Sequence, residues 1–147
     1  MMMAGMACIA LASLAAPASA GMLSATGEVI AIMGGNLFIG EAEGHLNGAG
    51  TLAISSQKNP ALTCKGEFTS SAELGGKGQL RCSDGTTSTF KFERLTLRKG
   101  HGTGNFGRGS MSFTYGLTAD EARPYLKLPK GKKLRQNGKK LELVGAT

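Results

Sequence analysis

The sequence is poor in the residues from which metal sites and catalytic sites are built. Its 147 residues include two histidines and three cysteines, and tryptophan is absent. Cys64 and Cys82 have no pair of histidines nearby, so they cannot complete the four ligands of a structural zinc ion. No catalytic or cofactor motif lies in the sequence context that its mechanism requires. We therefore expect no metal site, no cofactor and no catalytic site.

Two features that resemble catalytic motifs lack their usual surroundings. Residues 102–107 have the spacing G-x-G-x-x-G, but a dinucleotide loop must lead into a helix, and here the chain continues into an alternating segment at 110–115. His45 and His101 lie far apart, and no Gly-x-Ser-x-Gly elbow is present. A hydrolase that uses either histidine stays an alternative, and it would need a pocket that also holds a serine and an acid.

Helical periodicity is also scarce. The 23 glycines fall in short runs, which disfavours long helices and favours tight turns. One helix signal stands out, because Thr118 and Glu121 have the spacing of a capping box. Pro124 follows closely, so this pattern predicts one short helix near 118–126.

Alternating apolar and polar residues predict antiparallel strands. The alternation covers residues 62–68, 79–83, 90–93 and 110–115, with a short apolar strand at 28–33 and an Asp-Gly turn at 84–85. We expect a mainly β fold, an antiparallel meander that curls toward a small barrel or sandwich. Setting Cys64 opposite Cys82 also sets Phe68 opposite Gly78, which would place an aromatic ring over a glycine.

Further pairings are predicted for two other hairpins. A loop at Gly48-Ala49-Gly50 would set Leu46 opposite Leu52, and an Asn137-Gly138 turn would set Leu134 opposite Leu141. The solvent-facing side of the strand at 90–97 is expected to carry three cations. These are Arg94, Arg98 and Lys99.

Glycine-led units recur at 48–52, 76–80 and 102–106, and they loosely resemble MORN repeats, although the Tyr-x-Gly core of those repeats is absent. Residues 50–128 contain the elements Cys-x-Gly-x-Phe, Cys-Ser-Asp-Gly and Phe-Thr-Tyr-Gly. With these elements the chain resembles small exported, glycine-rich bacterial β proteins of no assigned function. The resemblance implies no catalytic residues.

Charge is missing from the first 20 residues. This segment is apolar and ends in Ala18-Ser19-Ala20, which predicts a signal peptide at 1–20, although the usual starting Lys or Arg is absent. Its apolar stretch is shorter than the roughly 20 apolar residues of a transmembrane helix, so no span is expected after cleavage. We divide the rest into an antiparallel β domain at 21–122 and a basic C-terminal hairpin at 123–147, packed on the same domain.

Two cysteines remain after the predicted cleavage, Cys64 and Cys82. An even pair in an exported chain favours a disulfide over two free thiols. The predicted location is the periplasm or the extracellular space.

The positive charge is concentrated at the C-terminal end. Residues 21–122 hold nine Lys or Arg and nine Asp or Glu, so the net charge of +7 comes from residues 123–147, where Glu142 is the one acid. Such a concentration of charge favours an anionic partner. The predicted anion-binding residues are Arg123, Lys127, Lys130, Lys132, Lys133, Arg135, Lys139 and Lys140.

These observations predict an exported, non-enzymatic protein that associates with an anionic envelope surface or polymer through the basic C-terminal segment. Tyr125 is the one aromatic residue near these charges, so base stacking is poorly supported and nucleic acid is disfavoured as the partner. A protein–protein interaction module that uses the sheet face or edge is an alternative, as is the hydrolase.

Overall fold

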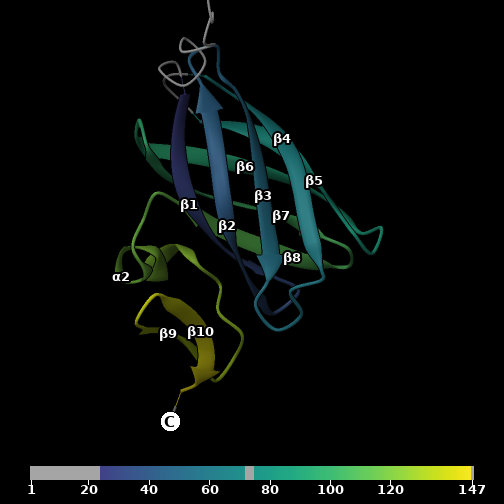
Figure 1. The fold of residues 1–147 in the computed structure, drawn as a ribbon, viewed down its shortest axis with the longest axis vertical. Coiled ribbons are helices and arrows are strands. Elements are labelled where there is room, and N and C mark those ends of the chain that lie inside the picture. Colours follow the sequence, from purple (N-terminus) through teal and green to yellow (C-terminus); the bar gives the residue numbers. More distant parts are fainter. Residues whose placement is uncertain (1–23, 72–74, 147) are drawn as a thin grey trace, which may run out of the picture.

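Eight antiparallel strands, each paired with the next along the chain, form the main body of the molecule. The computed structural model describes residues 24–71 and 75–146. The strands are β1 (Ser24–Met33), β2 (Asn36–His45), β3 (Ala49–Ser56), β4 (Thr63–Ser71), β5 (Gly75–Cys82), β6 (Thr87–Thr96), β7 (Lys99–Phe106) and β8 (Gly109–Tyr115). Because β1 also pairs with β8, the sheet closes into a barrel (Figure 1). The predicted mainly β fold is confirmed, and its closed form is the barrel.

The predicted disulfide between Cys64 and Cys82 is confirmed. Cys64 of β4 pairs with Cys82 of β5, and the two sulfur atoms are bonded at 2.01 Å. The predicted pairing of Phe68 with Gly78 is also confirmed. With 18 residues of sequence separation, such a bridge stabilises the fold by about 3 kcal/mol in the chain-entropy model.

The register predicted for the β2–β3 hairpin is wrong. Ala42 pairs with Leu52 and Gly44 pairs with Gly50, so the turn lies at 46–48 and Leu46 does not face Leu52. The reason is that Gly48, with φ of 88°, takes the left-handed conformation and ends the turn, so Ala49 and Gly50 belong to β3 and not to the loop. The side chain of Asn47 accepts a hydrogen bond from the Ala49 amide at 3.0 Å and stabilises this turn.

Inside the barrel, aromatic rings of even-numbered strands lie over glycines of the preceding strands. A Cβ atom built on any of these glycines would overlap a ring of its neighbour. The pairs are Phe68 over Gly50, Phe90 over Gly78, Phe92 over Gly76, Phe113 over Gly102 and Tyr115 over Gly100. Of the recurring Gly-x-Gly units, Gly50, Gly76, Gly78 and Gly102 therefore hold inward positions on β3, β5 and β7, where the rings fold back against the barrel wall.

The two ends of the barrel are filled differently. Near the β1–β2 and β5–β6 turns, the interior is occupied by buried side chains beside the disulfide. These are Met33, Phe38, Ile54, Leu80 and Met111. At the other end, near the β2–β3 and β6–β7 turns, the interior opens to solvent through a cavity. We call this open end the mouth.

A short helical segment follows the barrel. The helix α2 (Ala119–Ala122) leads into a single 3-10 turn, η1 (Arg123–Tyr125). The capping box is confirmed, because the Thr118 hydroxyl accepts from the Glu121 amide at 3.3 Å and the Glu121 carboxylate accepts from the Thr118 amide at 3.1 Å. The predicted short helix near 118–126 is therefore present.

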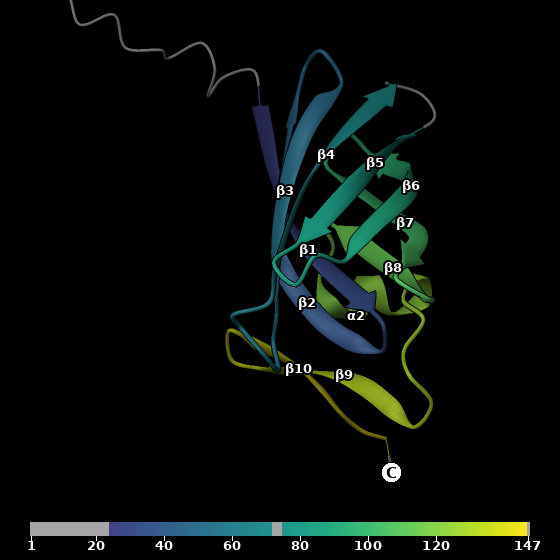
Figure 2. The ribbon, with the colours of Figure 1, turned by 90° about the vertical axis from the view of Figure 1, so that its right-hand side faces the viewer.

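A second, outer apolar cluster joins the C-terminal hairpin to the barrel. The hairpin consists of β9 (Lys132–Asn137) and β10 (Lys140–Gly145), which lie beyond the β1–β2 end of the barrel in both views (Figures 1 and 2). Its leucines pack with apolar residues from the outer faces of β1 and β2 and from the helical segment. The cluster contains Ile30, Ile32, Leu37, Leu117, Ala122, Leu126, Leu134 and Leu141.

The predicted register of this last hairpin is wrong. Leu134 pairs with Leu143 and not with Leu141, because the two-residue turn is Gly138-Lys139 and not Asn137-Gly138. A shift of two residues leaves every side chain on the same face of the strand. Leu134, Leu141 and Leu143 therefore still face the barrel together.

The predicted signal peptide at 1–20 lies outside the described residues. Within residues 24–71 and 75–146, no helix is long and apolar enough to cross a membrane.

Candidate functional site

All eight predicted anion-binding residues have exposed side chains. The structure brings only some of them together on one surface. On β9, Lys133 and Arg135 flank the buried Leu134, so they point to the opposite face of the hairpin. Lys140 of β10, paired with Asn137, lies on that same face. We call this surface the outer hairpin face, and its cations are Lys133, Arg135 and Lys140.

One carboxylate also lies on the outer hairpin face. Glu142 pairs with Arg135 across the hairpin, and its carboxylate lies 3.6 Å from the Lys140 ammonium. Three cations and one carboxylate leave the outer hairpin face with a net charge of +2. Lys139 in the turn adds a further exposed cation next to the face.

Two other predicted residues have structural contacts instead. The Arg123 guanidinium donates to the Leu134 carbonyl at 3.2 Å and lies 3.4 Å from the Asp120 carboxylate, so it ties the helical segment to β9. Lys127 is anchored through its backbone, since its amide donates to the Ser112 hydroxyl at 2.9 Å. Lys130 and Lys132 are exposed at the entry to the hairpin.

The two histidines lie in different places. His101 stacks on the Tyr125 ring with centroids 4.1 Å apart, and its Nε2 is 3.8 Å from the Glu93 carboxylate on the neighbouring strand. His45 is exposed at the end of β2, where it lines the mouth. Within the described part of the chain, no cluster of three metal-ligating residues occurs. The G-x-G-x-x-G run at 102–107 belongs to β7 and the turn into strand β8.

The mouth contains a cavity of about 490 Å³, which the sequence did not reveal. Its walls are largely apolar and include Leu52, Phe68, Phe90, Phe92 and Phe113. Their rings form edge-to-face contacts with centroids 5.2 to 5.5 Å apart, for Phe90 with Phe113 and for Phe68 with Phe92. Edge-to-face contacts of this kind favour fixed positions for the rings in the cavity wall.

Arg94 lines this cavity, and its predicted place on the solvent-facing side of the strand is wrong. On β6 it follows Phe90 and Phe92 at intervals of two, so it shares their inward face. Its guanidinium donates to the Ser70 hydroxyl at 2.6 Å. The alternation of Phe90, Phe92 and Arg94 was the sequence signal that could have identified it.

Tyr115 adds a second polar group at the mouth. Burial raises the pKa of its phenol, and the positive charge of Arg94 opposes that rise. The phenol therefore keeps its proton at neutral pH. Its oxygen is buried and has no hydrogen-bond partner among the residues that the structure describes.

Comparison with known proteins gives no assignment. No family model matches the chain, and neither a curated protein nor a solved structure matches it. Two surfaces of the described structure are candidates for function, the outer hairpin face and the mouth.

Proposed function

We propose that this is an exported, non-enzymatic protein that associates with an anionic component of the cell envelope through the outer hairpin face. The observation that carries the proposal is the division of the hairpin into two faces. Leu134 is 1% exposed and Leu141 is 6% exposed on the inner face, so the hairpin is fixed to the barrel. The cations opposite them are consequently held toward solvent.

The distribution of charge over the chain supports this proposal. Residues 21–122 are balanced, so the outer hairpin face is not opposed by a net negative barrel. Lys127, Lys130, Lys132 and Lys139 add exposed charge next to the face. A cluster of this kind is attracted to an anionic membrane by about 1 kcal/mol for each Lys or Arg near the surface.

The geometry favours a lipid or polymer surface over the alternative partners. Tyr125, the aromatic residue nearest the charges in sequence, is stacked on His101, so one face of its ring is already covered and is closed to a nucleic-acid base. In the barrel, strands β2 to β7 are paired on both sides, and β1 lacks a β8 partner only before Val29, so the barrel leaves little edge for strand addition by a protein partner.

The test compares two triple variants that lose the same charge from different places. One replaces Lys133, Arg135 and Lys140 by Gln, and the other replaces three exposed cations of the barrel wall. The control set is Lys65, Arg81 and Lys91. Co-sedimentation is measured with vesicles of phosphatidylcholine that contain phosphatidylglycerol, and with vesicles of phosphatidylcholine alone.

The proposal predicts that the wild-type protein binds the anionic vesicles and not the neutral ones. The hairpin variant should bind the anionic vesicles about a hundredfold more weakly than the wild-type protein, because each lost cation removes about 1 kcal/mol of binding free energy. The affinity of the barrel variant should fall much less. Added salt should weaken binding because the cations are exposed. Equal losses in the two variants would refute the assignment to the hairpin, and binding to neutral vesicles alone would refute the electrostatic mechanism.

A further inference from the structure

The cavity at the mouth exists because the aromatic side chains that could fill it lie against the wall. Phe90, Phe113 and Tyr115 fold over glycines of the adjacent strands, where any side chain would push the rings inward. Small inward residues on β2, Ala42 and Gly44, leave the opposite wall open. The resulting volume of about 490 Å³ falls within the range of small-molecule sites.

The charge inside this cavity is positive. Arg94 is half-buried, and no carboxylate forms an ion pair with it within residues 24–71 and 75–146. A guanidinium has five N–H donors, and the structure gives it one side-chain acceptor, Ser70. A partly desolvated guanidinium with free donors favours an anionic oxygen ligand, and it matches a carboxylate in shape and charge.

The remaining polar groups agree with a single anionic head. Tyr115 adds no charge, because its phenol keeps its proton, and its hydroxyl oxygen is buried beside Gly100 and not exposed to the cavity. Below Arg94, the inward positions of β6 are Phe92 and Phe90, and the cavity wall they form is aromatic. The cavity therefore combines one cation near its opening with apolar walls deeper inside.

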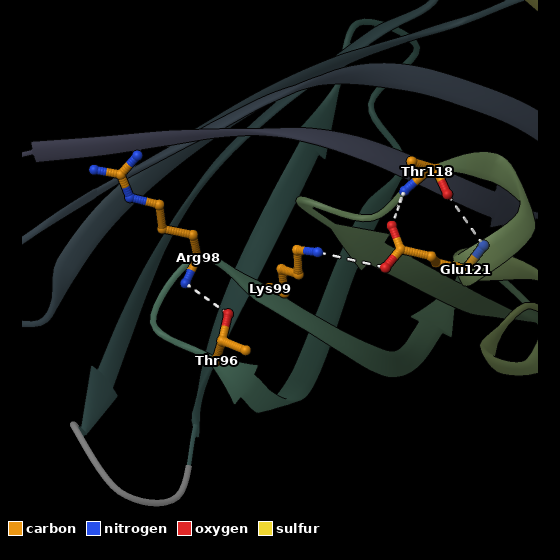
Figure 3. A network of polar contacts seen from close by, with 5 residues as sticks. All are labelled: Thr96, Arg98, Lys99, Thr118 and Glu121. Atoms are coloured by element: carbon orange, nitrogen blue, oxygen red, sulfur yellow. Dashed lines mark hydrogen bonds and ion pairs between the residues drawn. The ribbon is translucent and has the colours of Figure 1, made fainter.

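The rim of the mouth is apolar and exposed. Leu46 is 77% exposed and Leu97 is 73% exposed, although both are large hydrophobic residues, and both line the opening of the cavity. Arg98 lies beside Leu97, and Figure 3 shows its side chain extending away from the Lys99–Glu121 pair. An amphiphile that enters the cavity here can contact Leu46 and Leu97 with its chain and a second cation, Arg98, with its head group.

We infer that the cavity at the mouth is a binding site for a single-chain aliphatic carboxylate, with its head group at Arg94 and its chain between Leu52, Phe90 and Phe113. One guanidinium inside the lumen matches one negative charge, and the apolar depth matches an unbranched chain. This inference goes beyond the surface association proposed above and does not depend on it, because the two sites share no residues.

The test measures the affinity of the full chain for two ligands that differ in the head group, decanoate and decanol, by isothermal titration calorimetry. Decanoate should bind at least about tenfold more tightly, because a charge-assisted hydrogen bond to Arg94 is available only to the carboxylate. Arg94→Gln should remove this preference, because decanoate loses its charge-assisted partner, whereas decanol loses at most a weaker hydrogen bond. Arg81→Gln is the matched control, since Arg81 is exposed on the outside of the barrel, 3.6 Å from Glu67.

A second pair of variants tests whether the ligand binds inside the cavity. A Cβ at Gly44 makes ordinary contacts with the Phe68 ring, so Gly44→Leu is expected to fold and to project a side chain into the cavity. It should abolish binding of both ligands. Gly145→Leu is the matched control, because a Cβ there meets no atom within 4 Å. If Gly44→Leu does not fold, as judged by circular dichroism, Ala42→Leu fills the same space from the same strand.

Four results would overturn the inference. Absence of decanoate binding to the wild-type protein would exclude the site. Equal affinity for decanoate and decanol, or a preference that survives Arg94→Gln, would exclude the role of Arg94. Binding that persists in a folded cavity-filling variant would place the ligand elsewhere on the molecule.

Discussion

Glycine has a specific role in this barrel at the scale of the single residue. Gly102 of β7 faces inward between Phe92 and Phe113 in the register, and the Phe113 ring lies on its backbone. Because glycine has no side chain, the ring lies directly on the backbone, in space that a larger residue would occupy. The high glycine content of the chain is thus linked to aromatic packing as well as to turns.

A single added methyl group should therefore be costly at this position. In Gly102→Ala the Cβ would overlap the Phe113 ring and the Lys91 carbonyl oxygen. Overpacking of this kind destabilises a protein by about 1–3 kcal/mol. Urea denaturation should show this loss for Gly102→Ala and a change of less than about 0.5 kcal/mol for Gly145→Ala, an exposed position. Equal changes in the two variants would contradict the packing role.

Arg94 shows what could and could not be predicted for a single residue. The face that it occupies was available from the sequence, because Phe90, Phe92 and Arg94 alternate in phase. What the sequence did not supply was the space beside it, since an empty lumen depends on barrel closure and on rings that fold over glycines of other strands. Charged residues usually face solvent, and this expectation placed Arg94 on the wrong side.

At the scale of the element, the short helix depends on reciprocal caps and one ion pair. Figure 3 shows Thr118 and Glu121 capping each other, with the Lys99 ammonium 3.4 Å from the Glu121 carboxylate. Hydrogen bonds from Thr118, and then from Lys99, hold the pKa of Glu121 below its usual value. These contacts link the beginning of β7 to the segment that leads to the hairpin.

The lowered pKa predicts a stability change with pH that Glu121 controls. Because the carboxylate is favoured in the folded state, its contribution is present above the ordinary glutamate pKa and is lost as pH falls through the lowered value. Glu121→Gln should melt at a lower temperature than the wild-type protein at about pH 7, and the difference should shrink at about pH 3. Thermal unfolding followed by circular dichroism measures it, and an equal difference at both pH values would contradict the cap.

The accuracy of the predictions for whole elements followed the strength of the local signals. The capping box and the Asp84-Gly85 turn were predicted correctly, because their residues make the contacts that define the element. The hairpins at 46–48 and 138–139 were placed in the wrong register. Several glycines or asparagines near each turn can take the required conformation, so the local sequence does not select one of them.

At the scale of the whole molecule, the two proposed sites are separated. The outer hairpin face lies beyond the β1–β2 end of the barrel, and the mouth is at the other end (Figures 1 and 2). The sequence predicted the basic hairpin from its charges, but it did not predict the mouth. Closure between β1 and β8 joins strands about 80 residues apart, and no local pattern encodes a pairing of that range.

The proposed function is tested most directly by identifying the residues that contact an anionic surface. Backbone amide NMR spectra of the protein on bicelles with spin-labelled anionic headgroups report this residue by residue. We expect line broadening across Lys132–Asn137 and Lys140–Gly145, with Leu46 and Leu97 at the mouth unaffected. Broadening confined to the mouth, with the hairpin unaffected, would contradict it.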